Sequence, residues 1–460
     1  MNKKLQLLQS YSAQEKEMIE EQIGTFRAVL KKTKDKGESS GVGTDVDAEL
    51  QRLMIKAEDM QTEECVGKGS FGEVFKANYR GQTVAVKTLK NVDTETLDRF
   101  RDEILLMNDL KHGNIVGMVG CCWEMDLMAL VMEFCAKGTS TEVLKAEGVD
   151  FSWDDPLLKW VVDLSRAMKY LHGVSYYDAK SENSVNGIIH RDLKPDNCLV
   201  SETYSIKVAD FGESRAVLED ATMTQVGTPL FIAPEIVIGE HYTSSVDVFS
   251  FALTVLGFAV GGKSTLTEFL HIAWTSSLSE EDQEIAKTLE PSAGRCSHKM
   301  ISQKWRPLST YLVNTLKMPQ TIADLLMVCW DGVPANRPNF GEISEYLETE
   351  AKSGIMAMAS TAPEQGGEGG GGGATGKRRT STSGSLGLRI QARKAEEQKQ
   401  VKNGGNKLEK MRKGEELVKE NDTLRSRVAE LEKLLTEATG RGAVAVGAMG
   451  GGLPGQPDDE

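Results

Sequence analysis

The chain lacks the features that mark a secreted, membrane-spanning or metal-clustered protein. Its first residues, MNKKLQLLQS, contain no apolar signal core and no glycine after Met1 for myristoylation. The most apolar stretch, Val246 to Val260, contains Asp247 and is too short to cross a bilayer, so we expect a buried core helix. The seven cysteines have no repeated metal-ligand spacing, which indicates a reducing compartment. We therefore expect a cytosolic location, with a nuclear pool as the alternative.

Positive charge is also scarce. The 460 residues include 54 Lys and Arg against 68 Asp and Glu, for a net charge of −14. This balance argues against a nucleic-acid partner and against strong attraction to anionic membranes. A composition of 40% hydrophobic and 27% charged residues is ordinary for a soluble protein with polar extensions. The length allows two or three domains.

Composition separates a central folded domain, residues 55–350, from polar flanks. On the N-terminal side we expect a helix over 1–35, either a short coiled coil or a helix docked on the domain, and a linker over 36–54. The C-terminal segments that composition separates are a disordered Gly/Ser-rich linker at 354–390, a coiled coil at 406–440 and a disordered tail at 441–460.

The C-terminal coiled coil is predicted from leucines at seven-residue spacing, Leu417, Leu424 and Leu431. Asn421 occupies the other core position, where asparagine favours a parallel two-stranded arrangement. The sequence therefore predicts a homodimer, with a single exposed helix as the alternative.

The folded domain begins with β-forming residues and continues with helical patterns. Strands are expected at 64–66, 73–79 and 83–90, then a helix over 94–110. Two further apolar runs, around 116–122 and 128–134, complete a small sheet. Beyond Gly138 the patterns are mainly helical. The predicted fold class is α+β, with a small β-rich part followed by a larger helical part.

The most informative segment runs from His190 to Asn197 and is followed by Asp210-Phe211-Gly212. It supplies a candidate proton acceptor in Asp192, a lysine suited to a phosphate in Lys194, and two oxygen ligands suited to Mg²⁺ in Asn197 and Asp210. Phosphoryl transfer from ATP to a hydroxyl needs mainly such positioning and charge neutralisation.

A second candidate site is the glycine-rich run from Gly67 to Val74. Glycines let backbone amides approach phosphates, although dinucleotide-binding folds use a similar pattern. Here the run leads into a β-like segment, and Lys87 follows at hairpin distance, where it could neutralise phosphates. Glu103 lies on the inward face of the predicted helix and is the best partner for Lys87. Glu95 and Asp102 are alternatives that lie off this face.

These motifs resemble those of the eukaryotic protein kinases over about residues 58–350. The order of motifs is that of the family and includes Ala233-Pro234-Glu235, a buried helix aspartate at Asp247, and Arg337, which would pair with Glu235. The resemblance implies a bilobal fold that binds ATP and Mg²⁺ and acts on protein substrates.

The resemblance also implies residue roles. Asp192 would accept or orient the substrate proton, Asn197 and Asp210 would hold Mg²⁺, and Phe211 would pack beneath the helix that carries Glu103. The implied catalytic set is Lys87, Glu103, Asp192, Lys194 and Asn197.

The nucleotide would lie against a hinge strand that runs from Met128 to Cys135. Met132 would be the gatekeeper, backbone groups of Glu133 and Cys135 would meet adenine, and Ala85 and Leu199 would enclose the base. The implied nucleotide-binding set is Val66, Gly67, Lys68, Gly69, Ser70, Phe71, Gly72, Val74, Ala85, Lys87, Met132, Glu133, Cys135 and Leu199.

Lys194 and Thr228 resemble the serine/threonine class, and the segments Phe100-x-x-Glu103 and His112-x-Asn114 resemble its tyrosine-kinase-like group. The alternatives are a dual-specificity or tyrosine kinase and a pseudokinase scaffold. Scaffolds of that kind commonly lack the lysine or a metal ligand, and this chain has both.

The chain departs from the usual pattern of the family at two places. Gly173 to Gly187 is a polar insertion expected to form a surface loop, and Glu213 replaces the usual apolar residue after Asp-Phe-Gly. Arg191 is expected to bind a phosphate on Thr222 or Thr224, which would order residues 210–235. An activation segment that is ordered without modification is the alternative.

Overall fold

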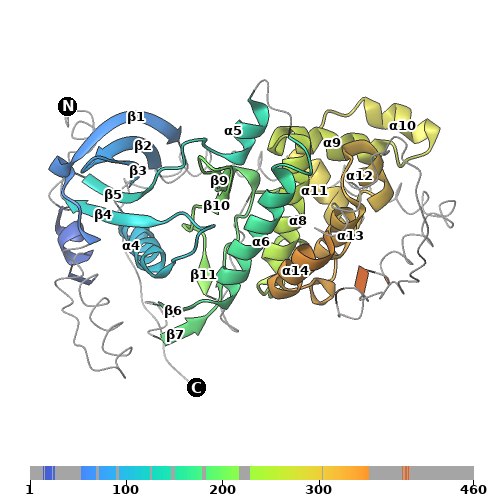
Figure 1. Ribbon diagram of the computed structural model, residues 1–460. Helices are drawn as coiled ribbons and strands as arrows, with labels where there is room; N and C mark the ends of the chain where they lie inside the picture. The colour runs from blue at the N-terminus through green and yellow to red at the C-terminus, as the bar shows by residue number, and fades with distance from the viewer. Residues whose placement is uncertain are drawn as a thin grey trace, which may run out of the picture. The chain divides into compact units, whose positions relative to one another are not determined.

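The computed structural model describes residues 53–351, apart from 69–71, 90–92, 125–126, 147–150, 179–182, 217–227 and 303, and short pieces between 14 and 25 and between 386 and 392. Within these residues the chain forms a β-rich first lobe and a helical second lobe (Figure 1). The α+β bilobal fold expected from the sequence is confirmed. The predicted coiled coil, the terminal tail and most of the two predicted linkers lie outside the described residues.

The first lobe is built on a five-stranded antiparallel sheet with the order β1-β2-β3-β5-β4. Its strands are β1 (Met60–Lys68), β2 (Gly72–Tyr79), β3 (Gln82–Leu89), β4 (Met118–Glu124) and β5 (Leu127–Glu133). All five include or overlap the stretches predicted from β-forming residues. Gly72 is required where β2 approaches β3, because a Cβ atom there would lie 1.6 Å from the Thr88 carbonyl oxygen.

Helix α4 (Thr94–Asp109) packs against this sheet. Asp93 begins the helix by accepting a hydrogen bond from the Thr96 amide at 2.9 Å, which satisfies one of the free N–H groups of the first turn. The helix buries an apolar face that includes Phe100 and Ile104. Glu103 lies between these two residues in the sequence and is buried with them.

The two faces of the sheet enter different cores. In β4 and β5 neighbouring side chains alternate, so that Cys121 and Leu130 join the large core with α4, whereas Cys122 and Val131 join a small core on the other face. Both cysteines are fully buried.

The second lobe is mainly helical. Its helices are α5 (Ser140–Lys145), α6 (Leu157–Gly173), α7 (Pro234–Val237), α8 (Ser245–Val260), α9 (Lys263–Thr275), α10 (Glu280–Lys287), α11 (Ala293–Ser302), α12 (Ser309–Leu316), α13 (Gln320–Cys329) and α14 (Phe340–Tyr346). Single turns occur at η1 (Ala57–Asp59) before the sheet and, in the second lobe, at η2 (Pro195–Asn197), η3 (Pro334–Asn336) and η4 (Leu347–Ala351).

Helix α8 is the buried core helix that the apolar run predicted, and it carries buried Asp247. No single helix among the described residues combines the length and apolarity that a membrane crossing needs. Only α8 taken together with residues Thr265–Thr275 of α9 reaches both, across a bend of 97°.

Three small antiparallel strand pairs connect the helices. The pairs are β9 (Cys198–Val200) with β10 (Ile206–Val208), β8 (Ile188–Ile189) with β11 (Arg215–Ala216), and β6 (Ser175–Asp178) with β7 (Asn183–Asn186). The third pair corrects the sequence analysis, which expected the insertion to be a surface loop. Tyr176 and Tyr177 favour extended backbone, and the two strands pair over four residues each.

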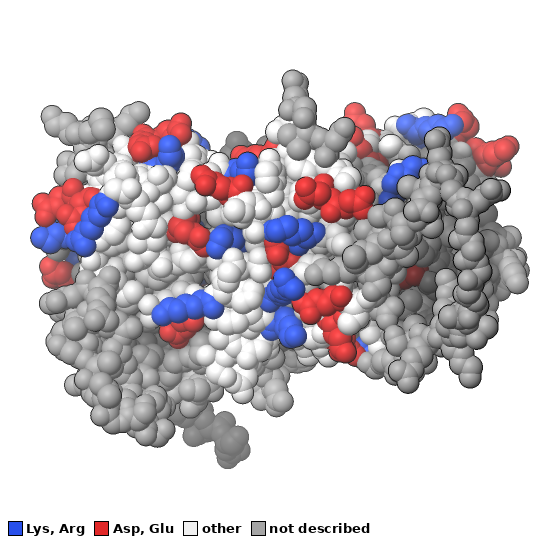
Figure 2. Space-filling view, in the orientation of Figure 1, with Lys and Arg blue, Asp and Glu red and all other residues white. Residues whose placement is uncertain are grey.

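On the face shown in Figure 2, described basic side chains lie beside acidic ones, and neither sign forms a continuous field. Ion pairs at the surface of the described part of the chain include Arg99 with Glu95.

Candidate active site

The centre of the site is a triad of charged side chains from three elements. Lys87 on β3 places its Nζ 2.7 Å from Glu103 Oε1 on α4 and 2.9 Å from Asp210 Oδ1, which follows β10. The helical pattern had favoured Glu103 over two alternatives. Of these, Glu95 pairs with Arg99 at the surface and Asp102 contacts Arg101.

Lys87 and Glu103 of this triad are largely buried, whereas the Asp210 side chain is partly exposed. Burial by itself lowers the pKa of Lys87, but the carboxylates of Glu103 and Asp210 more than offset it, so the ammonium is retained. Burial would raise the pKa of Asp210, yet nearby Lys87 holds it below its usual value. Burial raises the pKa of Glu103, and the attraction of Lys87 only partly opposes this. An ammonium and an ionised carboxylate therefore face the same site.

Asp192 is the centre of a second polar group. Its carboxylate accepts hydrogen bonds from Lys194 Nζ at 2.5 Å, from Asn197 Nδ2 at 3.1 Å and from Thr228 Oγ1 at 3.0 Å. Lys194 also donates to Thr228 Oγ1 at 2.9 Å. Thr228 thus joins Asp192 and Lys194 to the segment that leads to Ala233-Pro234-Glu235.

Asp247 of α8 holds the loop that carries Asp192 in place. The Asp247 carboxylate accepts from the backbone amides of His190 at 2.8 Å and Arg191 at 2.9 Å, and His172 Nε2 lies 2.8 Å away. Arg191 and Asp210 both have a φ of +66°, a left-handed conformation that costs energy for side chains other than glycine. Strained backbone thus occurs at both candidate catalytic segments.

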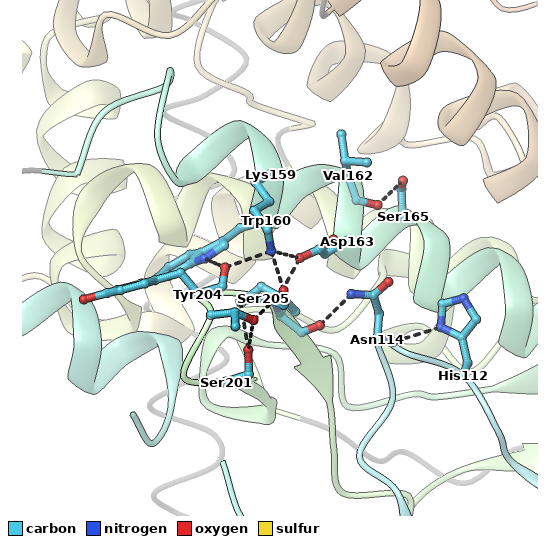
Figure 3. Close-up of polar contacts among 12 residues, drawn as sticks. His112, Asn114, Lys159, Trp160, Val162, Asp163, Ser165, Ser201, Tyr204 and Ser205 are labelled. Carbon is cyan, nitrogen blue, oxygen red and sulfur yellow. Dashed lines mark hydrogen bonds and ion pairs between the residues drawn. The ribbon is translucent and has the colours of Figure 1, made fainter. Parts of the chain in front are cut away.

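Strands β9 and β10 connect Asn197 to Asp210, and a polar network fixes their turn against α6 (Figure 3). Asp163 accepts from the Ile206 amide at 3.1 Å and from Lys159 Nζ at 2.8 Å. On the other side Asn114 Nδ2 donates to the Ile206 carbonyl at 2.9 Å. The network holds the segment that leads to Asp210 in a defined position.

The segment that ends in Ala233-Pro234-Glu235 is fixed by a buried ion pair. Both Glu235 carboxylate oxygens accept from Arg337, at 2.6 and 2.9 Å. Such two-point geometry is among the stronger forms of charged hydrogen bond. Phe211 is also buried, with its ring 5.4 Å from that of His190, in the same core as Ile104 of α4.

The strands bring part of the implied nucleotide-binding set together. Ala85 pairs with Met132 across β3 and β5, and Val74 pairs with Lys87 across β2 and β3. A cavity of about 240 Å³ lies beside the triad, lined in part by Lys87, Glu103 and Gly212.

Other members of the set take up different positions. Val66 is exposed, and Cys135 is buried where β5 leads into the second lobe. Gly67 and Lys68 end β1, and Leu199 forms an isolated bridge with Thr139. The residues that lie outside the described part are Gly69, Ser70 and Phe71 of the glycine-rich run and the candidate phosphosites Thr222 and Thr224.

The donor set fits Mg²⁺ bound together with a nucleotide. Asn197 directs its amide nitrogen at Asp192, and Asp210 contributes an ionised carboxylate. Among the described residues no group of three or more His, Cys, Asp and Glu side chains could hold a metal by itself. Mg²⁺ is commonly bound by one or two carboxylates plus phosphate oxygens, so a small protein ligand set is suitable.

The surroundings of Arg191 were missed by sequence reasoning. Its Nε donates to the Glu213 carbonyl at 2.5 Å, and its Nη1 donates to the Tyr242 hydroxyl at 3.1 Å. The Glu213 carboxylate lies 3.8 Å from Nη2, and the Arg191 side chain is only 3% exposed. The unusual residue Glu213 was the one feature of the sequence that pointed to these contacts. Nothing in the sequence pointed to Tyr242.

Comparison with known proteins agrees with this geometry. The profile of the family described as protein tyrosine and serine/threonine kinase matches residues 60–347. Serine/threonine-protein kinase STY17 of Arabidopsis thaliana is 33% identical over 297 residues, which cover 64% of this chain and 45% of that protein. Probable serine/threonine-protein kinase drkA of Dictyostelium discoideum is 33% identical over 295 residues, covering 64% and 40%.

Dual specificity protein kinase shkB of Dictyostelium discoideum is 30% identical over 304 residues, covering 64% of this chain and 41% of that protein. This chain spans less than half the length of these three relatives. The profile match extends over more than half of the chain, and the motifs occur in the folded positions just described. The chain belongs to the protein tyrosine and serine/threonine kinase family.

Proposed function

We propose that this protein transfers the γ-phosphate of ATP to serine and threonine hydroxyls of other proteins. The observation that carries the proposal is the charged triad, in which Lys87 contacts Glu103 and Asp210 together. A lysine held in this way presents a fixed positive charge to phosphates, and a fixed charge loses little energy to reorganisation during reaction.

In this proposal each side chain has one task. Lys87 orients the α- and β-phosphates, and Glu103 prevents Lys87 from turning away. Asp192 accepts or orients the proton of the substrate hydroxyl, while Lys194 is close enough to Asp192 to neutralise the transferred phosphoryl group. Asn197 and Asp210 would hold Mg²⁺, which supplies charge neutralisation between the phosphates.

The preference for serine and threonine is supported by Lys194 and Thr228, which contact each other and Asp192. Membership of the tyrosine-kinase-like group is proposed from the motifs around Phe100 and His112. A dual-specificity enzyme is the second candidate, favoured by the printed name of the relative shkB. A pseudokinase scaffold is disfavoured by the presence of Lys87, Asp192, Asn197 and Asp210.

The test is phosphorylation of a mixed peptide library by the full chain with Mg-ATP, beside an Asp192→Asn control. We expect incorporation at serine and threonine, and a loss of about 100-fold or more in the control. Incorporation at tyrosine as well would support the dual-specificity alternative. If the wild-type chain gave no more product than the control, the proposal would be wrong.

A further inference from the structure

Described pieces of the N-terminal segment, between residues 14 and 25, contact α4. Ile19 is fully buried and joins the same core as Leu97 and Phe100 of α4. Met18 Sδ accepts a hydrogen bond from Thr94 Oγ1 at 3.4 Å. In Figure 1 the dark-blue pieces of this segment lie below β4 and beside α4. The sequence predicted either a short coiled coil or a helix docked on the domain. The described pieces of this helix are docked on the domain.

A charged hydrogen bond joins the two elements at the centre of this contact. Gln22 is buried, and its Oε1 accepts from Arg101 Nη1 at 2.8 Å. The remaining contacts of the Arg101 guanidinium are to Asp98 at 2.9 Å and Asp102 at 3.0 Å, both on α4 itself. A buried guanidinium is costly unless it is hydrogen-bonded, so loss of the Gln22 acceptor would favour movement of Arg101 toward water.

Arg101 and Glu103 occupy opposite sides of one helix. Two residues correspond to about 200° around an α-helix, so when Arg101 faces the N-terminal segment, Glu103 faces Lys87. A shift of the Arg101 side of α4 would therefore also move Glu103, which lies 2.7 Å from Lys87. A helix behaves as a rigid body over this distance, and a displacement on one side is transmitted to the other.

We infer that Ile19 and Gln22 are positioning residues that hold α4 so that Glu103 reaches Lys87. This inference rests on the proposed kinase activity. It assigns the N-terminal segment a role in assembling the nucleotide site, through α4, although the segment itself contacts neither Lys87 nor Asp210 among the described residues.

Gln22 variants of the full chain test this role. Gln22→Met keeps the volume and removes the acceptor, whereas Gln22→Glu keeps an acceptor for Arg101. Glu20→Gln changes an exposed residue of the same segment and is the matched control. For each we would measure kcat and KM for ATP, the melting temperature, and backbone hydrogen exchange across residues 94–109.

We expect Gln22→Met to lower kcat/KM for ATP by about tenfold, as loss of one charge-assisted hydrogen bond implies, and to speed exchange in α4. Gln22→Glu and Glu20→Gln should stay within about twofold of the wild type. Ile19→Ala should lower kcat/KM for ATP and speed exchange in α4, as Gln22→Met does. Ile19→Val keeps most of the buried side chain and should show only a small part of these effects.

Two outcomes would overturn the inference. One is wild-type kcat/KM and exchange in Gln22→Met. The other is equal impairment in Gln22→Met and Gln22→Glu, which would mean that Gln22 acts by packing alone. A wild-type chain with no activity would instead refute the proposed function, and exchange in α4 would still test whether Gln22 positions the helix.

Discussion

At the scale of single residues, the contacts of Lys87 with Glu103 and Asp210 make this lysine important for both activity and stability. Lys87→Met should lower kcat/KM for ATP by about 100-fold or more, because a preorganised charge is lost. It should also destabilise the fold, because Glu103 would remain buried without its cation. Adding Glu103→Gln should recover the melting temperature but not the rate. Full activity in Lys87→Met would contradict the role proposed for the triad.

Glu213 is the second residue for which a definite effect is expected. Because Arg191 already contacts Glu213 and Tyr242, a phosphate on Thr222 or Thr224 would have to compete for its guanidinium. We expect phosphatase treatment to reduce activity more in Glu213→Ala than in the wild type. Mass spectrometry of the active enzyme gives a separate check, since an unmodified segment 217–227 would remove the phosphorylation hypothesis. An equal phosphatase effect in both proteins would count against competition at Arg191.

At the scale of elements, α8 supports the catalytic loop through Asp247. Burial disfavours its ionised form, but the hydrogen bond from His172 and the charges of His172 and His190 outweigh this and hold the pKa of Asp247 below its ordinary value of 3.8. The stability that Asp247 contributes is therefore fully present above pH 3.8 and is lost as the pH falls through the lower folded-state value.

Asp247→Asn should lower the free energy of unfolding by about 2 kcal/mol at pH 7, since two backbone amides lose a charged acceptor. Urea titrations between pH 7 and pH 3 should show this difference staying constant down to about pH 3.8 and shrinking below it. Asp154→Asn, at an exposed position, should change the free energy of unfolding little at pH 7 or at pH 3. A difference that grew toward low pH would contradict the direction of the pKa shift.

Elements with local patterns were predictable from the residues themselves, whereas a contact between distant segments, such as that of Arg337 with Glu235, was predictable only through the family resemblance. The first-lobe strands and α4 followed from residue type and spacing, and the inward stripe of α4 gave Glu103 as the neighbour of Lys87. In contrast, the pairing of His172 with Asp247 joins residues 75 positions apart in two buried helices. Nothing in the local sequence of either helix distinguishes these two residues from other polar residues that are buried in a core.

The inserted hairpin and the docked N-terminal segment show the same limit. The polar composition of Gly173–Gly187 predicted exposure correctly for Ser175 but concealed strand pairing, because β6 and β7 are stabilised by each other. For the N-terminal segment, the apolar stripe allowed two partners, a second helix or the domain. The contacts of Thr94 and Arg101 with this segment in the folded chain favour the second.

At the scale of the whole molecule, the predicted coiled coil lies outside the described residues and stays a prediction. Deleting residues 406–440 should halve the mass measured by light scattering and slow autophosphorylation at low protein concentration, because the local concentration of the partner is lost. A variant that replaces only Leu424 and Leu431 by lysine tests the seam without shortening the chain. An unchanged mass in both would refute pairing through this segment.

The distribution of thiols has a practical consequence. All seven cysteines are free, and Cys65 of β1 alone is exposed. Burial raises the pKa of Cys135 to about 11 and that of Cys121 to about 12, which slows alkylation because the thiolate is the reacting form. A maleimide dye should therefore attach selectively to Cys65, two residues before Gly67. The unmutated protein thus offers a single optical reporter of how its glycine-rich strand responds to nucleotide.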